Sequence, residues 1–226
     1  MSTPENQVPE LPSSAKLITT LATVAMISGL LVVLVYEFTK PIIAENQRMA
    51  TERAIFTVLP SAKSHLTFVV EQDKLKLTGD KTEGELVYAG YDQHNNLVGV
   101  AINAAAQGYQ DIVKILYGYN PDSSCIVGFD VLKSTETPGF GTKITTDKQF
   151  LANFKCLDSQ LNMAQSGLAN AITTVRHGTK KHDWQIDAIS GSTITSNAIG
   201  RMLNKSAQKL IPVLIKNLEV LKQGKH

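Results

Sequence analysis

Residues 17–36 read LITTLATVAMISGLLVVLVY, an unbroken stretch without a charged side chain. A helix of about 20 apolar residues crosses a hydrocarbon core of roughly 30 Å, so this stretch predicts a transmembrane helix. Lys16 stands on one side, and Tyr36 and Lys40 on the other, as at a membrane interface. A cleaved signal peptide would have a shorter apolar region and a small-residue cleavage site, and a buried soluble helix would normally carry a polar face.

The charges beside this stretch leave its orientation open. The short N-terminal tail, residues 1–16, carries two positive charges, on Lys16 and the α-amino group, and two acidic residues. Lys40, Arg48 and Arg53 follow the stretch. By the positive-inside rule, a bare count slightly favours the cytoplasm for the residues that follow.

Composition limits the classes of function. The 226 residues are 43% hydrophobic and 19% charged, enough for one ordinary globular domain and an anchor. The net charge of +2 and the 6% aromatic content indicate no nucleic-acid surface. Cys125 and Cys156 lack metal-site spacing, so no metal site is predicted. They could form a disulfide outside the cytoplasm, or serve as two small buried apolar residues.

Residues 37–60 predict an amphipathic connecting helix that continues from the anchor. Pro41 suits the first turn of a new helix, and Ile42, Met49 and Phe56 recur every seven residues between charged side chains. The helix is expected to stop near Pro60.

Residues 61–226 predict one α+β domain. Residues 61–84 have no clear pattern. Strands are expected in 85–104 (two, around the polar turn 94–96), 111–119, 125–133 and 185–189. Helices are expected from a cap at 146–147 to 154, and in a long final segment whose apolar face holds Ile194, Ala198, Met202 and Leu210, with a break or bend at Pro212.

Residues 187–196, DAISGSTITS, form the first motif that could carry chemistry. They fall at a strand-to-helix turn, where Gly191 permits close backbone approach. Hydroxyls and free N–H groups at the start of a helix make a phosphate site. Ser and Thr are also ordinary helix caps, so the run alone does not require a cofactor.

Residues 135–143, TETPGFGTK, form the second motif, directly after the strand at 125–133. Pro138-Gly139 indicates a tight turn, and the glycines around Phe140 would let backbone amides approach a planar ligand. A plain surface turn would look the same. A third glycine turn, Gln107-Gly108-Tyr109, is interpreted as structural.

Taken together, the two motifs resemble those of a known family. Asp187 followed by Ser-Gly-Ser-Thr resembles the flavinylation motif D-x-x-S/T-G-A/S-T of the FMN-binding domains in Rnf-type complexes and sodium-pumping NADH:quinone reductases. The loop at 136–141 resembles that family's E-T-P-G-L-G loop near the flavin. The single anchor, the following helix and the order of elements agree, so the resemblance spans most of the chain.

The resemblance implies a membrane-anchored G subunit of an Rnf-type complex, with 61–226 as the FMN-binding domain. A flavin transferase would attach FMN as a phosphoester to Thr193, and Asp187 would serve recognition by that transferase. The other expected cofactor-binding residues are Ser190, Gly191, Ser192, Ile194, Thr195, Glu136, Thr137, Pro138, Gly139, Phe140 and Gly141. No catalytic side chain is expected; the chain would act as a redox member of a translocase, with the other members of the complex and the membrane as partners.

Two positions depart from the family pattern: Ser192 stands for the commoner Ala, and Phe140 for the commoner Leu. Both leave the acceptor hydroxyl in place. The resemblance also implies the bacterial inner membrane, with the C-terminal domain in the periplasm. Two alternatives stay open at this point: the C subunit of a sodium-pumping NADH:quinone reductase, and a non-redox membrane-anchored assembly module. Neither a Rossmann G-x-G-x-x-G nor a P-loop is present, so direct NADH or ATP binding is not expected.

Overall fold

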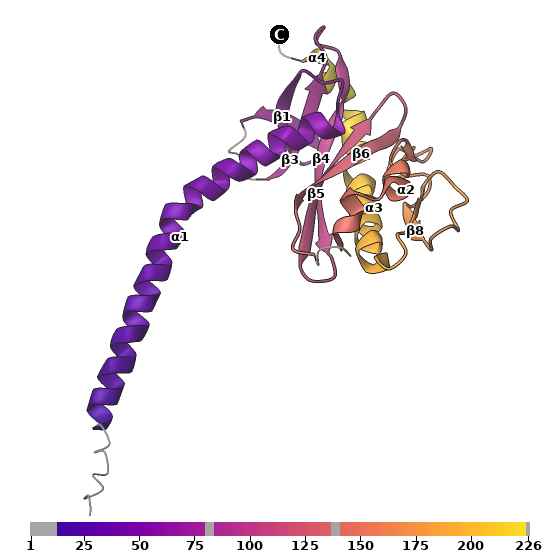
Figure 1. The fold of residues 1–226 in the computed structure, drawn as a ribbon. Helices are drawn as coiled ribbons and strands as arrows, with labels where there is room; N and C mark the ends of the chain where they lie inside the picture. The colour runs from indigo at the N-terminus through magenta and orange to yellow at the C-terminus, as the bar shows by residue number, and fades with distance from the viewer. Residues whose placement is uncertain (1–12, 80–83, 137–140, 225–226) are drawn as a thin grey trace, which may run out of the picture. The chain divides into compact units, whose positions relative to one another are not determined.

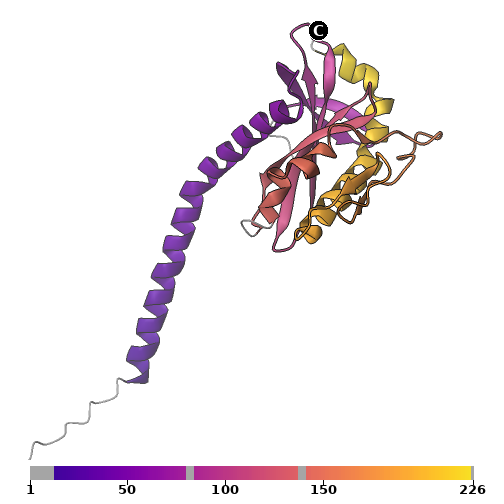
Figure 2. The same ribbon diagram turned by 45° about the vertical axis from the view of Figure 1, so that its right-hand side comes forward.

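The computed structural model describes residues 13–79, 84–136 and 141–224 (Figures 1 and 2). The chain divides into two compact units, Met1–Gln47 and Arg48–His226. Thr137, Pro138, Gly139 and Phe140, which the sequence assigned to the flavin loop, lie outside the described residues.

One continuous helix, α1, runs from Ser14 to Val58 and holds the whole apolar stretch. The prediction of a new helix at Pro41 was wrong, because Pro41 lies inside α1. Proline has the φ angle of a helix, so its missing N–H costs one hydrogen bond without forcing the chain to stop.

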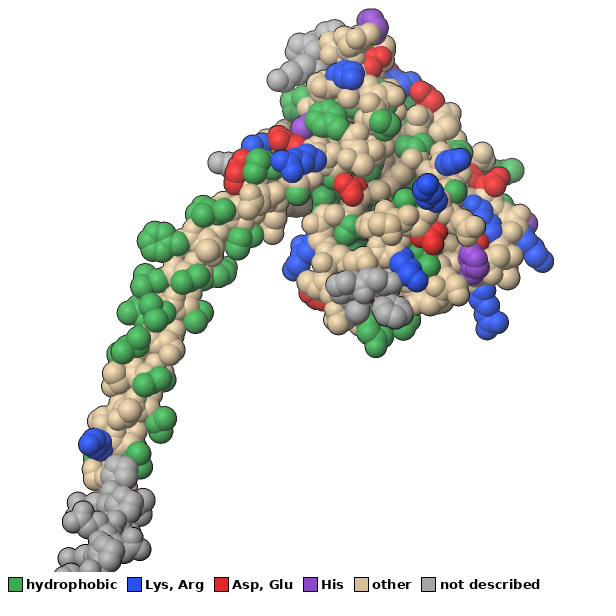
Figure 3. Space-filling model, in the orientation of Figure 1, with side chains coloured by type: hydrophobic (Ala, Val, Ile, Leu, Met, Phe, Trp, Pro, Cys, Tyr) green, Lys and Arg blue, Asp and Glu red, His purple; other side chains and the backbone are tan. Residues whose placement is uncertain are grey.

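The apolar part of α1 has the length and exposure of a membrane span. Within the described residues, α1 is the one helix long and apolar enough to cross a membrane, and none of its most apolar window is buried. Figure 3 shows hydrophobic side chains along the visible face of this part of the helix. The predicted anchor is therefore a fully exposed apolar helix, as a lipid-facing segment must be.

The predicted face of α1 packs only toward the C-terminal end of the helix, where Phe56 is partly buried against the core. Ile42 is exposed and Met49 is half-buried, whereas Ala54, Ile55 and Val58 are buried. The second unit begins only at Arg48, so the buried side chains of α1 belong to its last turns. There they pack with Leu59 and Ala62 against one face of the sheet, on Tyr88, Ala101 and Leu116.

A seven-stranded antiparallel sheet organises the second unit, in the order β2-β1-β3-β4-β5-β6-β7. Its strands are β1 (Ser64–Glu71), β2 (Lys74–Thr78), β3 (Glu85–Tyr91), β4 (Leu97–Gln107), β5 (Ile112–Asn120), β6 (Cys125–Lys133) and β7 (Leu157–Asp158). The predicted strands at 85–104, 111–119 and 125–133 are confirmed. The segment 61–84, which showed no pattern, forms β1 and β2, whose residues pair across a tight turn at Gln72-Asp73.

The strand alternation builds a core on both faces of the sheet. In β4, Ala101 faces the end of α1, while Val100 and Ile102 belong to the main core. Helix α3 (Thr193–Lys216) covers that second face, packing buried side chains such as Met202 and Leu210 over β4 (Figure 2). The α+β fold class is therefore confirmed.

The final helix corrects two expectations. It is not broken at Pro212, which lies inside the helix and is buried, and it ends at Lys216, with Asn217 as its C-cap, before the short α4 (Leu218–Gln223). Ile194 is 53% exposed and does not share the buried face of Ala198, Met202 and Leu210. The reason is its position in the first turn, which lies beside a pocket rather than over the sheet.

Shorter elements complete the second unit. A 3-10 helix, η1 (Gly141–Thr145), leads to α2 (Lys148–Ala152), where Asp147 caps as predicted by accepting bonds from the amides of Gln149 and Phe150. Strands β8 (Thr173–Val175) and β9 (Gln185–Asp187) form a separate parallel pair. Cys125 and Cys156 form a disulfide with a Cα–Cα distance of 5.0 Å, which resolves the two alternatives left open by their spacing.

Candidate functional site

The turn between β9 and α3 leads into a helix whose first amides have no acceptor within that helix. Gly191 has φ +80°, a conformation that favours glycine, and the Ser192 amide donates to the carbonyl of Ile189. The first intrahelical bond runs from the Ser196 amide to the Ser192 carbonyl at 3.0 Å. The three amides of residues 193–195 therefore have no acceptor within α3, and they present partial positive charge at the helix end.

The hydroxyls of this turn divide by exposure. Ser190 and Thr193 are exposed, whereas Ser192, Thr195 and Ser196 are 6%, 3% and 0% exposed. Ser196 donates to the Ser192 carbonyl and accepts from the Ile189 amide, so it holds the turn together. A second macromolecule can therefore reach only Ser190 and Thr193 without opening the turn.

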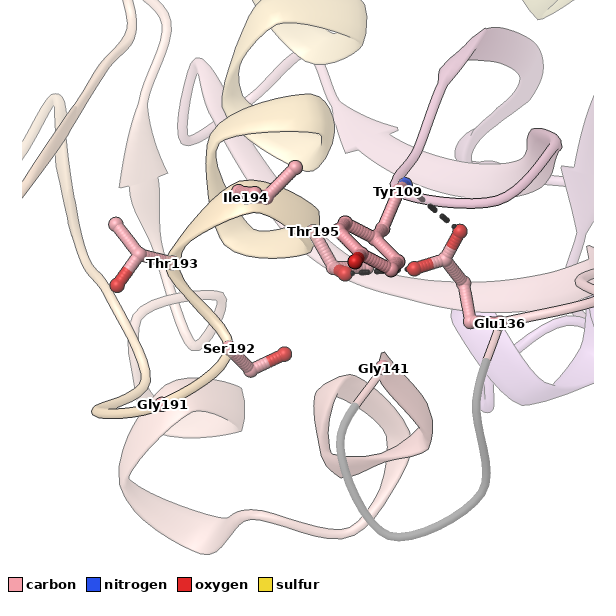
Figure 4. Close-up of a pocket in the computed structure, with 8 residues that line it drawn as sticks. All are labelled: Tyr109, Glu136, Gly141, Gly191, Ser192, Thr193, Ile194 and Thr195. Carbon is pink, nitrogen blue, oxygen red and sulfur yellow. Dashed lines mark hydrogen bonds between the residues drawn. The ribbon is translucent and has the colours of Figure 1, made fainter.

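Glu136 ties three segments together at the centre of the site. Its Oε1 accepts from the amides of Tyr109 and Gln110, at 2.9 and 3.1 Å. Its Oε2 accepts from the Thr195 hydroxyl at 2.8 Å (Figure 4). Gly108 and Gly141 stand so close that a Cβ at either would collide with the Glu136 side chain. The buried Glu136 thus joins the β4–β5 hairpin, the segment after β6 and α3.

These residues border a cavity of ≈ 440 Å³, shown in Figure 4. Tyr109 and Ile194 supply exposed apolar surface, and the Ser192 hydroxyl points into the space toward Gly141. The residues that line it are Tyr109, Glu136, Gly141, Gly191, Ser192, Thr193, Ile194 and Thr195. The structure thus brings the two sequence motifs to one pocket.

Two of the expected residues lie beside a neighbouring, smaller cavity of ≈ 260 Å³. Ser190 and Asp187 line it, together with Lys143 and His177. Asp187 Oδ1 accepts from the Gly178 amide at 2.7 Å, and Oδ2 lies 3.5 Å from Nδ1 of His177. Asp187 therefore has a structural role, since it fastens the turn after β8 to β9.

Sequence reasoning missed two residues of the site. Tyr109 was interpreted as part of a structural turn, yet it forms a wall of the pocket; no signal beyond the adjacent Gly108 marked it. Asn153 was not considered. It is buried, and its side-chain amide bonds both the N–H and the carbonyl of Asp187, at 3.1 and 3.3 Å. The Asn153 side chain thus bonds the backbone of Asp187 as an adjacent β-strand would, and it fixes the start of the turn that leads to α3.

The pocket suits a small ligand with a partly apolar body and an anionic group. Apolar side chains and glycine backbone line the space, while the first turn of α3 presents amides that have no acceptor within the helix. Among the described residues, no group of three or more His, Cys, Asp or Glu is placed to hold a metal ion.

Two family models match the chain. The FMN-binding domain model covers residues 108–208, which include every residue around the pocket, and the RnfG N-terminal region model covers residues 15–58. The two models thus cover the apolar part of α1 and the segment that contains the pocket residues.

Curated relatives agree with these models. The chain is 30% identical over 189 residues to the G subunit of the ion-translocating oxidoreductase complex of Methanosarcina acetivorans, covering 81% of this chain and 87% of that protein. It is also 30% identical to the G subunit of the same type of complex in Pseudomonas aeruginosa, covering 80% and 81%. The G subunit of the proton-translocating ferredoxin:NAD(+) oxidoreductase complex of Clostridium ljungdahlii is 25% identical, with 84% and 88% covered.

Solved structures share the fold. NqrC of Shewanella oneidensis superimposes with a TM-score of 0.62 at 17% identity, covering 77% of this chain and 99% of that chain. The C subunit of a Na(+)-translocating NADH-quinone reductase from Parabacteroides distasonis has a TM-score of 0.52 at 21% identity, with 73% and 80% covered. At these identities the likeness concerns the fold, whereas the sequence relatives decide the family. The chain belongs to the family of G subunits of Rnf-type ion-translocating oxidoreductase complexes.

Proposed function

We propose that this membrane-anchored chain carries FMN as a phosphoester on Thr193 and transfers electrons within an Rnf-type complex that translocates ions. The proposal also includes the other members of the complex as partners and a flavin transferase that attaches the cofactor. When bound, FMN supplies one- and two-electron redox chemistry, and the protein supplies position and electrostatics.

The exposure of the hydroxyls is the observation that supports this attachment atom. Thr193 is exposed at the first turn of α3, where a transferase can reach it. Thr195 is buried and already donates to Glu136. Ser190 is exposed but lies before Gly191 and lines the smaller cavity instead.

The residues of the pocket fit the cofactor. The ≈ 440 Å³ cavity, with Tyr109 and Ile194 at its border, has the size and apolar lining of a small-molecule site. A phosphate on Thr193 would lie beside the amides of residues 193–195, where an anion gains about 0.3–1 kcal/mol. The buried hydroxyl of Ser192 supplies an additional polar group inside the pocket.

A direct test uses the full-length chain produced with a flavin transferase. The parent should fluoresce on a denaturing gel under ultraviolet light, and mass spectrometry should find FMN on the peptide that contains Thr193. Thr193→Ala should lose this signal and keep its stability within about 0.5 kcal/mol, because the lost hydroxyl is exposed. Ser190→Ala is the matched control and should retain the flavin. Flavin on Thr195 or Ser190, or retained in Thr193→Ala, would contradict the assignment.

The proposed location is the bacterial inner membrane, with the second unit in the periplasm. The disulfide between Cys125 and Cys156 supports this side of the membrane, since disulfides persist in oxidising compartments. Alkaline phosphatase fused after Gly224 should be active, because it folds only outside the cytoplasm. If a reporter that is active only in the cytoplasm were active at the same position, the proposed orientation would be wrong.

A further inference from the structure

Ser192 has a hydroxyl that is buried and unused. The residue is 6% exposed, and its Oγ has no hydrogen-bond partner among residues 13–79, 84–136 and 141–224. Burying a hydroxyl without a partner is unfavourable, so such groups are rare in folded proteins and call for an explanation.

The position of Ser192 would normally provide a partner for its hydroxyl. Ser192 is the N-cap of α3, and an N-cap serine normally accepts a bond from the second or third amide of its helix. Here Ser192 has φ −131° and ψ 36°, and its side chain makes no capping bond. The hydroxyl therefore does not satisfy the amides of the first turn, although the two would ordinarily satisfy each other.

The direction of the side chain explains the arrangement. In Figure 4 the Ser192 hydroxyl points into the pocket toward Gly141, whereas the Thr193 side chain points away from the other pocket residues. The side chains of Ser192 and Thr193 therefore lie toward different parts of a bound molecule. The helix amides and Thr193 suit the phosphate, and Ser192 faces the space left for the body of the ligand.

We propose that the Ser192 hydroxyl donates a hydrogen bond to an acceptor on the isoalloxazine ring of FMN and thereby raises the reduction potential of the flavin. This inference rests on the proposed function. Two-electron reduction adds a proton from solvent at N5 of the ring and leaves one net negative charge on N1 and the carbonyl oxygens, so the proposed acceptor is one of these atoms rather than N5. A donor fixed beside them stabilises the reduced ring more than the oxidised ring, as preorganised donors do wherever negative charge develops.

The test compares the full-length parent with Ser192→Ala, each with and without covalent FMN. Alanine is the commoner residue at this position of the flavinylation motif, so the variant should still accept the cofactor. Dithionite supplies the two electrons in a titration that gives the midpoint potential. Loss of one neutral hydrogen bond should raise the ratio of oxidised to reduced flavin at a fixed potential by about five- to tenfold. A tenfold change corresponds to about 30 mV lower potential for a two-electron couple.

Thermal unfolding provides a second readout that does not depend on redox chemistry. Without FMN, Ser192→Ala should melt at the same temperature as the parent or higher, because the deleted hydroxyl had no partner among the described residues. FMN should raise the melting temperature of the variant less than it raises that of the parent. Ser159→Ala is the matched control: Ser159 is also buried, but it donates to the Ser124 carbonyl, so its loss should destabilise both forms and leave the potential unchanged.

The outcomes separate the inference from the proposed function. An unchanged potential in flavinylated Ser192→Ala would overturn the ring contact and leave the attachment at Thr193 intact. A variant that is equally destabilised with and without FMN would show that the hydroxyl has a partner within the protein, which also overturns it. A parent chain that takes up no covalent FMN would contradict the proposed function itself.

Discussion

The hydroxyl of Thr195 donates a hydrogen bond of 2.8 Å to Oε2 of Glu136 across 59 positions of sequence, and both side chains are buried. The other carboxylate oxygen of Glu136 accepts from the amides of Tyr109 and Gln110. One side chain thus sets the spacing between the β4–β5 hairpin and the first turn of α3. The width of the pocket depends on this bridge.

Thr195→Val should test the bridge, because valine keeps the shape of threonine and removes only the hydroxyl. The change leaves a buried oxygen of Glu136 without its donor, so the free energy of unfolding should fall by about 1–3 kcal/mol. Urea unfolding measures this loss. Thr173→Val, an exposed threonine in β8, is the control and should change it by less than about 0.5 kcal/mol. Equal stability of the two variants would show that the bridge contributes nothing.

The same pair bears on the flavin. If Glu136 holds the pocket open at the right width, Thr195→Val should still carry covalent FMN on Thr193, with an altered visible spectrum. Glu136→Ala should alter the spectrum further, because it also frees the amides of Tyr109 and Gln110. Spectra identical to that of the parent would mean that the segment after β6 acts only as a turn.

Variants of Asp187 and Asn153 distinguish recognition by the flavin transferase from a contribution to the stability of the fold. Asp187→Asn keeps an oxygen that can accept from the Gly178 amide, so stability should change by less than about 1 kcal/mol. Because Asp187 is proposed to serve recognition by the flavin transferase, covalent FMN should nevertheless be lost. Full flavinylation of Asp187→Asn would refute that role.

Asn153→Ala is the structural counterpart. It removes the pairing with the backbone of Asp187 and a bond from Lys180, so the free energy of unfolding should fall by about 2 kcal/mol. Flavinylation should slow only as far as the turn is displaced. The two variants are compared by urea unfolding and by the rate of FMN incorporation.

Much of the fold followed from patterns in the sequence. The apolar stretch and the β-branched strands carry their own signals, since length, charge and alternation are local properties. Pro41 and Pro212 misled the prediction, because proline disfavours but does not forbid a helix interior when packing or continuity supports it. Ile42 was assigned to a packed face but is exposed, because a periodic pattern cannot reveal where the surface that packs on it begins.

Only some of the contacts in the candidate site could be predicted from the sequence. The glycine and hydroxyl motifs pointed to Glu136, Ser192 and Thr193, but the sequence could not show that Glu136 and Thr195 touch. Tyr109 and Asn153 act through tertiary contacts, which leave no spacing signature in one sequence. The division of the hydroxyls into exposed and buried ones also depends on the folded turn.

Stability should fall in alkaline solution through buried tyrosines. Burial raises the pKa of Tyr91 to about 12 from its ordinary value of 10.0, and it raises the pKa values of Tyr117 and Tyr119 as well. Below pH 10 the phenols are neutral in both states and have no effect. Between pH 10 and 12 the unfolded chain loses these protons while Tyr91 keeps its own, so unfolding becomes easier as pH rises.

Tyr91→Phe isolates one part of this effect. The variant loses the bond from the Tyr91 hydroxyl to the Leu221 carbonyl at 2.7 Å, so it should be about 1 kcal/mol less stable at about pH 8. Between the ordinary and the raised pKa of Tyr91, its stability should decline less steeply than that of the parent. Urea unfolding at a series of pH values across that range gives both slopes; parallel slopes would show that Tyr91 ionises normally in the folded chain.

The disulfide between Cys125 and Cys156 should stabilise the folded domain that holds the site. It closes a loop over a sequence separation of 31, and that loop contains Glu136 and Gly141 at the border of the pocket. Constraining such a loop in the unfolded chain is worth about 3–4 kcal/mol in the loop-entropy model. Reduction with dithiothreitol should therefore lower the free energy of unfolding by that amount. The double variant Cys125→Ala/Cys156→Ala should have the lower free energy of unfolding without reductant, and dithiothreitol should not change it further. Two titratable thiols in the unreduced parent, together with unfolding that dithiothreitol does not change, would show that the bond does not form.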